Sequence, residues 1–447
     1  MKKSNVPEMF IHFLWRQLCF DLKELKTTQG QLIRLDKTGY GNADAGPDFL
    51  DARIWIGETL WAGNVEIHVL SSEWYLHKHQ DDPAYDNVIL HVVLTEDRPV
   101  ISRIGWRIPC LVLEDRIPKE ALRMYHRWMN SRHWVACQSG LADFPTLRLN
   151  LWLDRLLVER LEDRVGGMSR LLEKHTGNWE RVFMISMFRG FGLKVNADAM
   201  EMLAESIPDK LLDRIRDRPF ELEAILLGQS GLIPENPEDS YSSKLSESYQ
   251  FLAYKHKLKA ISRVVWKFSR LRPSAFPAVR IARLAAMINQ YPHWMRTVLE
   301  MRSPSDFFDF LQVELSPYWQ KHFRFGQFSE KADTNPGKEW AKVLVLNVVI
   351  PFLFLYGRQT GQEQMVNKAL SWMDQLPAED NRVIRSWKSL IDVQTAGQGQ
   401  AAIHLWKNYC QKKRCLECRI GQHLIGDQAR GSGFAKRHQA GKQKGRE

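Results

Sequence analysis

The sequence predicts an α+β N-terminal domain followed by a large all-α domain. Short apolar runs rich in β-branched residues are concentrated in the first 115 residues, whereas apolar positions recur at the helical period of about 3.6 from Ile117 onward. The chain has 447 residues, of which 44% are hydrophobic and only six are cysteine. This composition provides a substantial core and excludes a disordered chain, a collagen-like chain and a disulfide scaffold.

The N-terminal elements follow one another in a clear order. Apolar side chains at helical spacing, including Phe10, Phe13 and Leu14, predict a helix within residues 7–20. A Gly-rich segment, residues 39–48, interrupts the apolar runs that come next. The expected strands are residues 31–35, 52–56, 60–70, 88–95 and 104–113. Since the run 88–95 is nearly all apolar, we expect that strand to be covered on both faces.

The second half of the chain carries helical periodicity throughout. The expected helices are residues 149–172, 222–227, 252–268, 279–288 and 341–355. The most apolar stretch, residues 343–356, is shorter than the roughly 20 residues that span a bilayer. We therefore expect it to be a buried core helix, and we expect no membrane contact.

The N-terminus shows no secretory signal, because His12 and Arg16 interrupt its apolar stretch. This predicts a cytoplasmic protein whose cysteines are reduced thiols or metal ligands rather than disulfides.

We expect four parts: an α+β domain over residues 1–115, a helical domain over 116–405, a Cys-rich metal clip over 406–426 and a disordered basic tail over 427–447. Much of the net charge of +11 lies near the end, since residues 407–447 hold 11 Lys and Arg against three acidic residues. A basic segment on a near-neutral body is typical of proteins that bind nucleic acid, although it can also serve only solubility.

Residues 42–91 hold the densest run of reactive side chains. Within the strand 60–70, an alternation of two places Glu66 and His68 on one face. A hairpin turn centred near Gly57 and Glu58 would bring Asp48 level with residues 66–68 of the neighbouring strand. Two carboxylates and an imidazole would then converge, which is an arrangement that holds Mg²⁺ or Mn²⁺ for phosphodiester cleavage. A purely structural alternative is that Asp48 ends a turn and Glu66 pairs with an arginine.

The order of these elements resembles the core of the PD-(D/E)XK nuclease superfamily. The matching residues are Pro47-Asp48 and Glu66-Ile67-His68, with Glu8 early in the first helix. The resemblance implies a mixed, restriction-endonuclease-like sheet in which Asp48 and Glu66 bind the metal and the third residue positions or activates the attacking water. His68 departs from the pattern, since the superfamily usually has lysine there. Histidine can act as a base near neutral pH or as a metal ligand.

The whole chain is also similar to an uncharacterised bacterial family of unknown function. The signatures that carry this similarity are Gly-Pro-Asp-Phe, Gly-Asn-Val-Glu-Ile-His and Ile-Leu-His-Val-Val, at residues 46–49, 63–68 and 89–93. This resemblance is closer than the first and implies no activity.

Histidines give a second interpretation of the same region. His77 and His79 would point the same way on an extended segment, and with His68, Asp82 and His91 they could hold zinc or manganese. Alternatively, His77 and His79 lie on a polar surface loop and His91 is a core histidine. For His91 we favour the core histidine over the metal ligand, because this residue lies in a continuous apolar run.

A cysteine cluster lies near the C-terminal end. Cys410, Cys415 and Cys418 precede His423 with the spacing Cys-x4-Cys-x2-Cys-x4-His. These four side chains could hold zinc or an iron–sulfur cluster. A similar cluster of four cysteines at different spacing holds the iron–sulfur cluster of some DNA glycosylases. The alternative is three reduced, partly exposed thiols.

Basic residues surround these cysteines, namely Lys412, Lys413, Arg414 and Arg419. We expect them to lower the pKa values of the thiols and to face a phosphate backbone.

Together these observations predict a metal-dependent nuclease acting on DNA or RNA. Two alternatives remain open: a non-catalytic nucleic-acid-binding or adaptor protein with a degenerate nuclease fold, and a zinc-dependent hydrolase centred on His68, His77 and His79.

Overall fold

The computed structural model describes residues 6–330 and 337–431. The chain divides into two compact units. The first comprises residues 1–152, 388–391 and 403–447, and the second comprises residues 153–387 and 392–402.

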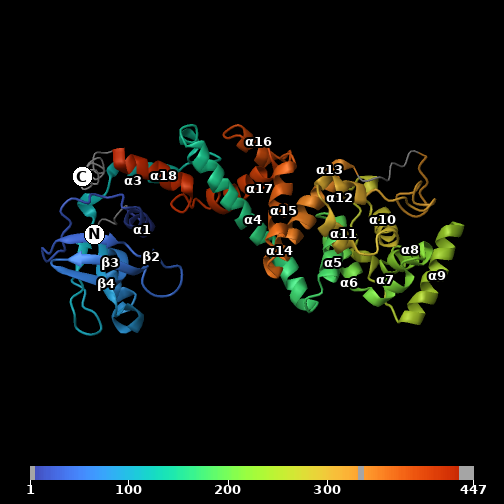
Figure 1. Ribbon diagram of the computed structural model, residues 1–447, viewed down its shortest axis with the longest axis horizontal. Helices are drawn as coiled ribbons and strands as arrows, with labels where there is room; N and C mark the ends of the chain where they lie inside the picture. The colour runs from blue at the N-terminus through green and yellow to red at the C-terminus, as the bar shows by residue number, and fades with distance from the viewer. Residues whose placement is uncertain (1–5, 331–336, 432–447) are drawn as a thin grey trace. The chain divides into compact units, whose positions relative to one another are not determined.

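The first unit is built on a mixed sheet of six strands, drawn in blue in Figure 1. The strand order is β1-β3-β4-β5-β6, and β2 pairs with β3. Pairing is antiparallel from β1 through β3 to β4 and parallel from β4 through β5 to β6. The strands are β1 (Ile33–Lys37), β2 (Tyr40–Gly41), β3 (Phe49–Ile56), β4 (Thr59–Leu70), β5 (Val88–Thr95) and β6 (Cys110–Val112). The predicted fold class, a mixed sheet followed by a mostly helical region, is confirmed.

The hairpin between β3 and β4 has the register expected from the sequence. Ile56 pairs with Thr59 across a two-residue turn, and Phe49 pairs with Val65. Gly57 has a φ of 60°, a conformation that two-residue hairpin turns require and that glycine adopts without a steric cost. Residue 48 therefore lies level with residue 66.

A crossover of short helical turns joins the parallel strands β4 and β5, because parallel neighbours cannot be linked by a hairpin. It contains the helix α2 (Glu73–Leu76) and the 3-10 turns η1 (His79–Asp81) and η2 (Pro83–Tyr85). The Glu73 side chain accepts hydrogen bonds from the backbone of Val69 at 3.0 Å and of Leu70 at 2.9 Å, which fixes the crossover to the end of β4.

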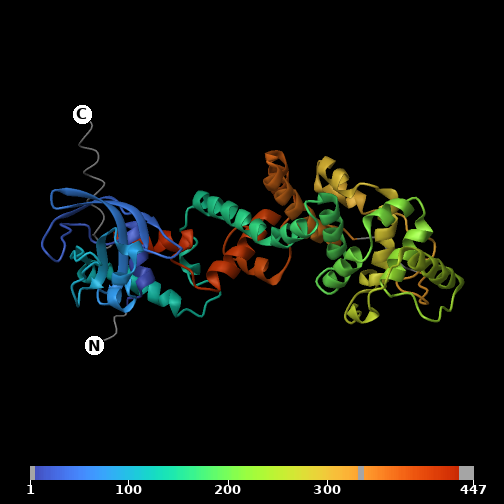
Figure 2. The same cartoon turned by 90° about the horizontal axis from the view of Figure 1, so that it is seen from below.

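Apolar residues cover both faces of the sheet's centre. All but the last of the eight residues of β5 are buried, as expected from its continuous apolar sequence. The helix α1 (Glu8–Gln17) packs against β4 with a buried face that includes Phe10, Phe13 and Leu14 (Figure 1 and Figure 2).

The first unit also includes helices from both ends of the chain. The helix α3 (Lys119–Met129) packs against α18 (Arg419–Ala429). Because of this packing, residues 116–152 and 403–431 belong with the sheet, so the division differs from the four expected segments. Residues 427–429, expected in a disordered tail, are helical, and the prediction for residues 432–447 lies outside the described residues.

The second unit is helical. The long helix α4 (Thr146–Lys174) begins in the first unit and continues into the second. The helices that follow are α5 (Trp179–Phe191), α6 (Ala197–Glu205), α7 (Asp209–Ile215), α8 (Pro219–Gln229), α9 (Ser240–His256), α10 (Pro277–Gln290), α11 (Trp294–Glu300), α12 (Pro304–Phe310), α13 (Lys338–Leu344), α14 (Ile350–Thr360), α15 (Glu363–Gln375), α16 (Arg382–Lys388) and α17 (Ala396–His404).

One predicted helix is wrong beyond its first five residues. The expected helix over 252–268 ends at His256, because Lys257 adopts a left-handed conformation with a φ of 53° and closes the helix. The predicted core helix at 341–355 is confirmed as α13, a π-helical turn and α14. Within the described residues, the segment Lys338–Thr360 is long and apolar enough to cross a membrane, and 78% of its apolar window is buried inside the protein.

The close approach of β4 to β5 makes Gly63 sensitive to substitution. A Cβ atom there would lie 2.5 Å from the backbone oxygen of Asn87 and 2.5 Å from Cγ2 of Ile89. We expect Gly63→Ala to destabilise the first unit by about 1–3 kcal/mol, measured as a lower urea midpoint, since overpacking forces backbone shifts. The neighbouring exposed residue provides the control, Ala62→Ser. Equal midpoints for the two variants would contradict this reading of the packing.

Candidate functional site

Asp48 and Glu66 are held against each other by the backbone of the hairpin. The backbone N–H of Asp48 donates to Oε2 of Glu66 at 3.1 Å, and the N–H of Ile67 donates to Oδ2 of Asp48 at 2.9 Å. Glu66 is almost completely buried and Asp48 is partly buried. The register of β3 and β4 therefore brings the two predicted carboxylates together.

The helix α1 contributes two further side chains to the same place. Nε2 of His12 lies 3.4 Å from Oδ2 of Asp48 and 3.9 Å from Oε1 of Glu8. Glu8 and His12 are four residues apart and therefore share one face of the helix. Sequence reasoning assigned no site role to His12, although its spacing from Glu8 was a usable signal.

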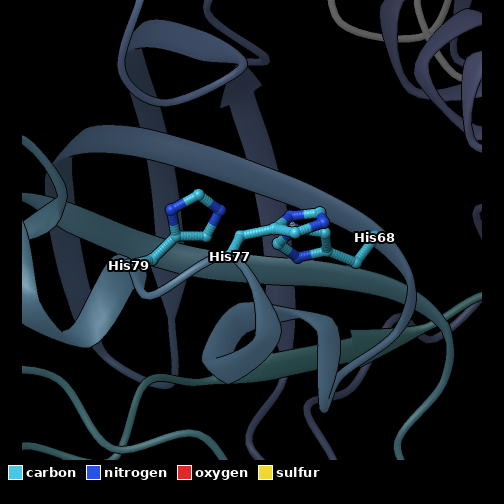
Figure 3. Close-up of side chains that lie close together, drawn as sticks. All are labelled: His68, His77 and His79. Atoms are coloured by element: carbon cyan, nitrogen blue, oxygen red, sulfur yellow. Dashed lines mark hydrogen bonds between the residues drawn. The ribbon is translucent and has the colours of Figure 1, made fainter.

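Three imidazoles lie beside the carboxylates. One nitrogen atom of each of His68, His77 and His79 lies within 4.8 Å of the others, and Figure 3 shows the three rings together. Nε2 of His68 lies 3.1 Å from Nδ1 of His77, and Nε2 of His79 lies 3.2 Å from Oε1 of Glu66. The carboxylates and the imidazoles thus form one continuous cluster.

The backbone conformation of residues 77–79 differs from the expected one. The prediction that His77 and His79 lie on an extended segment with their side chains on the same face is wrong. His77 ends the helix α2, and Lys78 has a φ of 62°, so the chain turns sharply before His79. The turn still brings the ring centroids within 5.4 Å of each other.

His91 is a core histidine, as the favoured interpretation held, but it also contacts the cluster. It is fully buried in β5, and its Nε2 lies 2.9 Å from Nδ1 of His68. Both ring nitrogens of His68 therefore have imidazole neighbours, His91 on one side and His77 on the other. Asp82 is exposed and accepts a hydrogen bond from the backbone of Ala84, so it caps the turn η2.

Burial determines the charge of this cluster. It raises the pKa of Glu66 to about 9, helped by the charge of Asp48, and it raises the pKa of Asp48 to about 6. Burial also lowers the pKa of His68 to about 2 and that of His91 to about 3. His68 and His91 are therefore neutral near pH 7, which is the form of imidazole that binds metals. Two adjacent buried carboxyl groups need a shared proton or a cation.

No arginine of the part of the chain that the structure describes forms an ion pair with Glu66, in contrast to the structural alternative. Among the described residues, its ion-pair neighbours are His68 at 3.7 Å and His79 at 3.2 Å. The structure thus brings together all five predicted side chains of this region, Asp48, Glu66, His68, His77 and His79.

Cys410, Cys415 and Cys418 belong to the first unit, as the carboxylate and histidine cluster does, but they lie more than 300 residues further along the chain. His423 is engaged elsewhere, since its Nδ1 lies 2.9 Å from a guanidinium nitrogen of Arg148 and its Nε2 lies 3.1 Å from a carboxylate oxygen of Asp427. The expectation that basic neighbours lower the thiol pKa values is wrong. Burial dominates and raises the pKa of Cys415 to about 11, although Lys413 opposes this shift.

The fold and the site define an α+β protein that gathers carboxylate and imidazole side chains at a sheet and its crossover. The chain belongs to the family described as Protein of unknown function (DUF2851), whose model matches residues 8–382. Neither the curated proteins nor the solved structures compared with the chain include a match.

The raised pKa of Glu66 predicts a pH dependence of stability in metal-free protein. The folded state favours the protonated acid, so this stabilisation is complete below the ordinary value of 4.5 and is lost as pH rises through about 9. The lowered pKa values of His68 and His91 stabilise the folded state fully above pH 6.5, and this stabilisation is lost only as the pH falls. The two histidines therefore do not change the loss of stability that Glu66 causes at alkaline pH.

We therefore expect the first unit to become less stable between pH 6.5 and 9 in the presence of a chelator, measured by thermal unfolding. Glu66→Gln should flatten this dependence, because the amide does not titrate. The exposed Glu58, at the other end of the hairpin, provides the control Glu58→Gln, which should keep the wild-type slope. Identical slopes in all three proteins would show that Glu66 does not titrate in this range.

Proposed function

We propose that the protein is a metal-dependent nuclease that hydrolyses phosphodiester bonds in DNA or RNA. The observation that carries the proposal is the convergence of the Asp48 and Glu66 side chains on one hairpin, next to neutral imidazoles. Paired carboxylates with neighbouring nitrogen donors are typical of sites for divalent cations.

The donor atoms fit such a cation. Carboxylate oxygens suit Mg²⁺ and Mn²⁺, and imidazole nitrogens suit Mn²⁺ as well as Zn²⁺. Ionising both buried carboxyl groups would concentrate negative charge unfavourably, and a cation would neutralise that charge in place of the proton. A divalent ion bound there would polarise the phosphoryl oxygen and make a bound water more acidic.

The imidazoles differ in what they can contribute. His79 lies 3.2 Å from Glu66 and stacks on Tyr85 at a centroid distance of 3.9 Å, so its position is fixed. Burial lowers the pKa of His79, which leaves a neutral ring able to accept a proton from water near pH 7. His79 is thus the best placed base, with His77 beside it.

His68 cannot replace the charge of the lysine usual in PD-(D/E)XK nucleases. With a pKa of about 2 it stays neutral, and both its nitrogens face other imidazoles. Its role in this proposal is to position His77 or to bind the metal. Without the positive charge, stabilisation of the phosphate must come from the cation and from basic residues elsewhere.

A cleavage assay tests the proposal directly. Asp48→Asn and Glu66→Gln should each lower the rate on plasmid, single-stranded DNA or RNA with Mg²⁺ or Mn²⁺ by at least about 100-fold, because metal stabilisation is worth several kcal/mol. The control Glu58→Gln should retain wild-type activity. Equal rates in wild type and Glu66→Gln would assign any cleavage to a contaminant.

The three-histidine group favours a second candidate, a zinc-dependent hydrolase. Three imidazoles whose ligand atoms lie within 4.8 Å of one another match the ligand number of catalytic zinc sites. In that case purified protein should carry about one zinc, and His77→Ala should remove both the zinc and the activity, whereas the nuclease proposal predicts activation by added Mg²⁺ or Mn²⁺. Metal analysis of the wild-type protein and of His77→Ala distinguishes the zinc-dependent hydrolase from the nuclease.

The remaining alternative, a non-catalytic nucleic-acid-binding or adaptor protein, rests on the basic residues near the C-terminus. It predicts binding to nucleic acid that weakens steeply with salt, without cleavage in any metal. That result, with Glu66→Gln binding as tightly as wild type, would overturn both catalytic proposals.

A further inference from the structure

The three C-terminal cysteines lie on a tightly folded loop. It begins at Cys410, the last residue of the π-helical turn η8 (Leu405–Cys410), and ends at Cys418, which caps the helix α18. π-helical turns occur frequently at functional sites. A Cβ atom on Gly421 would lie 2.1 Å from the backbone oxygen of Cys415, so only glycine lets the loop fold back this closely onto α18.

A fourth cysteine from a distant part of the chain meets this loop. Cys137 follows α3 and precedes the 3-10 turn η4 (Gln138–Gly140). Residues on both sides of it contact the loop's flanks. The ring of Trp134 stacks on that of Trp406 with centroids 5.7 Å apart, and a Cβ on Gly140 would lie 2.9 Å from Leu424.

The four thiols are mutual neighbours. The thiols of Cys418, Cys137 and Cys415 lie close enough to Cys410 to interact with it electrostatically, and those of Cys418 and Cys415 interact with Cys137 in the same way. None of the four forms a disulfide.

One observation favours an iron–sulfur cluster over a single zinc ion. The spacing Cys-x4-Cys-x2-Cys with a distant fourth cysteine is that of plant-type iron–sulfur proteins.

We propose that Cys137, Cys410, Cys415 and Cys418 bind an iron–sulfur cluster, with Cys137 rather than His423 as the fourth ligand. The cluster fastens the C-terminal segment to the segment between α3 and α4, within the first unit. It is independent of the carboxylate and histidine site, so it stands whether or not the nuclease proposal holds.

The first test uses the full chain purified without oxygen. We expect iron and acid-labile sulfide in comparable amounts, a visible charge-transfer absorption that bleaches on reduction, and a paramagnetic signal in one redox state. Zinc without sulfide would overturn the iron–sulfur assignment. Protein that takes up neither metal, even after reconstitution with iron and sulfide, would overturn the site itself.

The second test identifies the fourth ligand. Cys137→Ser should lose most of the iron and sulfide, whereas His423→Ala should keep them. Cys110, buried in β6, provides the matched control, and Cys110→Ser should also keep the cluster. Unchanged iron in Cys137→Ser would overturn the assignment of Cys137.

A third measurement does not depend on the variants folding. In wild-type protein with the cluster, Cys137, Cys410, Cys415 and Cys418 should resist alkylation, and all four should become reactive together when a chelator removes the iron. Mass spectrometry of the peptides reports each cysteine. Equal labelling of Cys137 before and after iron removal would contradict its role as a ligand.

Discussion

The first unit depends on one electrostatic constraint, the burial of two carboxyl groups side by side at the end of a hairpin. Neither Asp48 nor Glu66 can move away, because each accepts a hydrogen bond from the backbone of the opposite strand. Removing such a pair from water is unfavourable unless a proton or a cation is bound. Burial keeps His68 neutral, so its ring does not supply a positive charge. The cation proposed for this site would supply it.

The sequence predicted the central part of this site because the information is local. A glycine turn of two residues fixes the register of β3 and β4, and an alternation of two then fixes which side chains share a face. The same reasoning could not give the path of residues 77–79. A single left-handed residue, Lys78, turns the chain there, and no pattern in the sequence distinguishes it from an extended loop. The proximity of His77 and His79 was predicted for the wrong geometric reason.

Long-range packing determines the residues that the sequence did not assign. His12 reaches Asp48 only because α1 packs on β4, and Cys137 meets the C-terminal loop only because α3 packs on α18. Spacing along the chain proposed His423 as a ligand since it lies near the cysteines in sequence. In the fold its ring is turned toward Arg148 and Asp427. A spacing pattern relates side chains on one loop and says nothing of side chains that packing brings in from another element.

The arrangement of donors around Glu66 shows why the two catalytic candidates share one place. The carboxylates of Asp48, Glu66 and Glu8 and the imidazoles of His68, His77 and His79 are neighbours in one cluster. His79 connects the two groups, because its Nε2 lies 3.2 Å from Glu66 and its ring contacts the rings of His68 and His77. A hard cation would use the carboxylate oxygens and leave His79 free as a base, whereas zinc would take His79 as a ligand and remove that base. The identity of the metal therefore decides whether His79 binds it or accepts a proton from water.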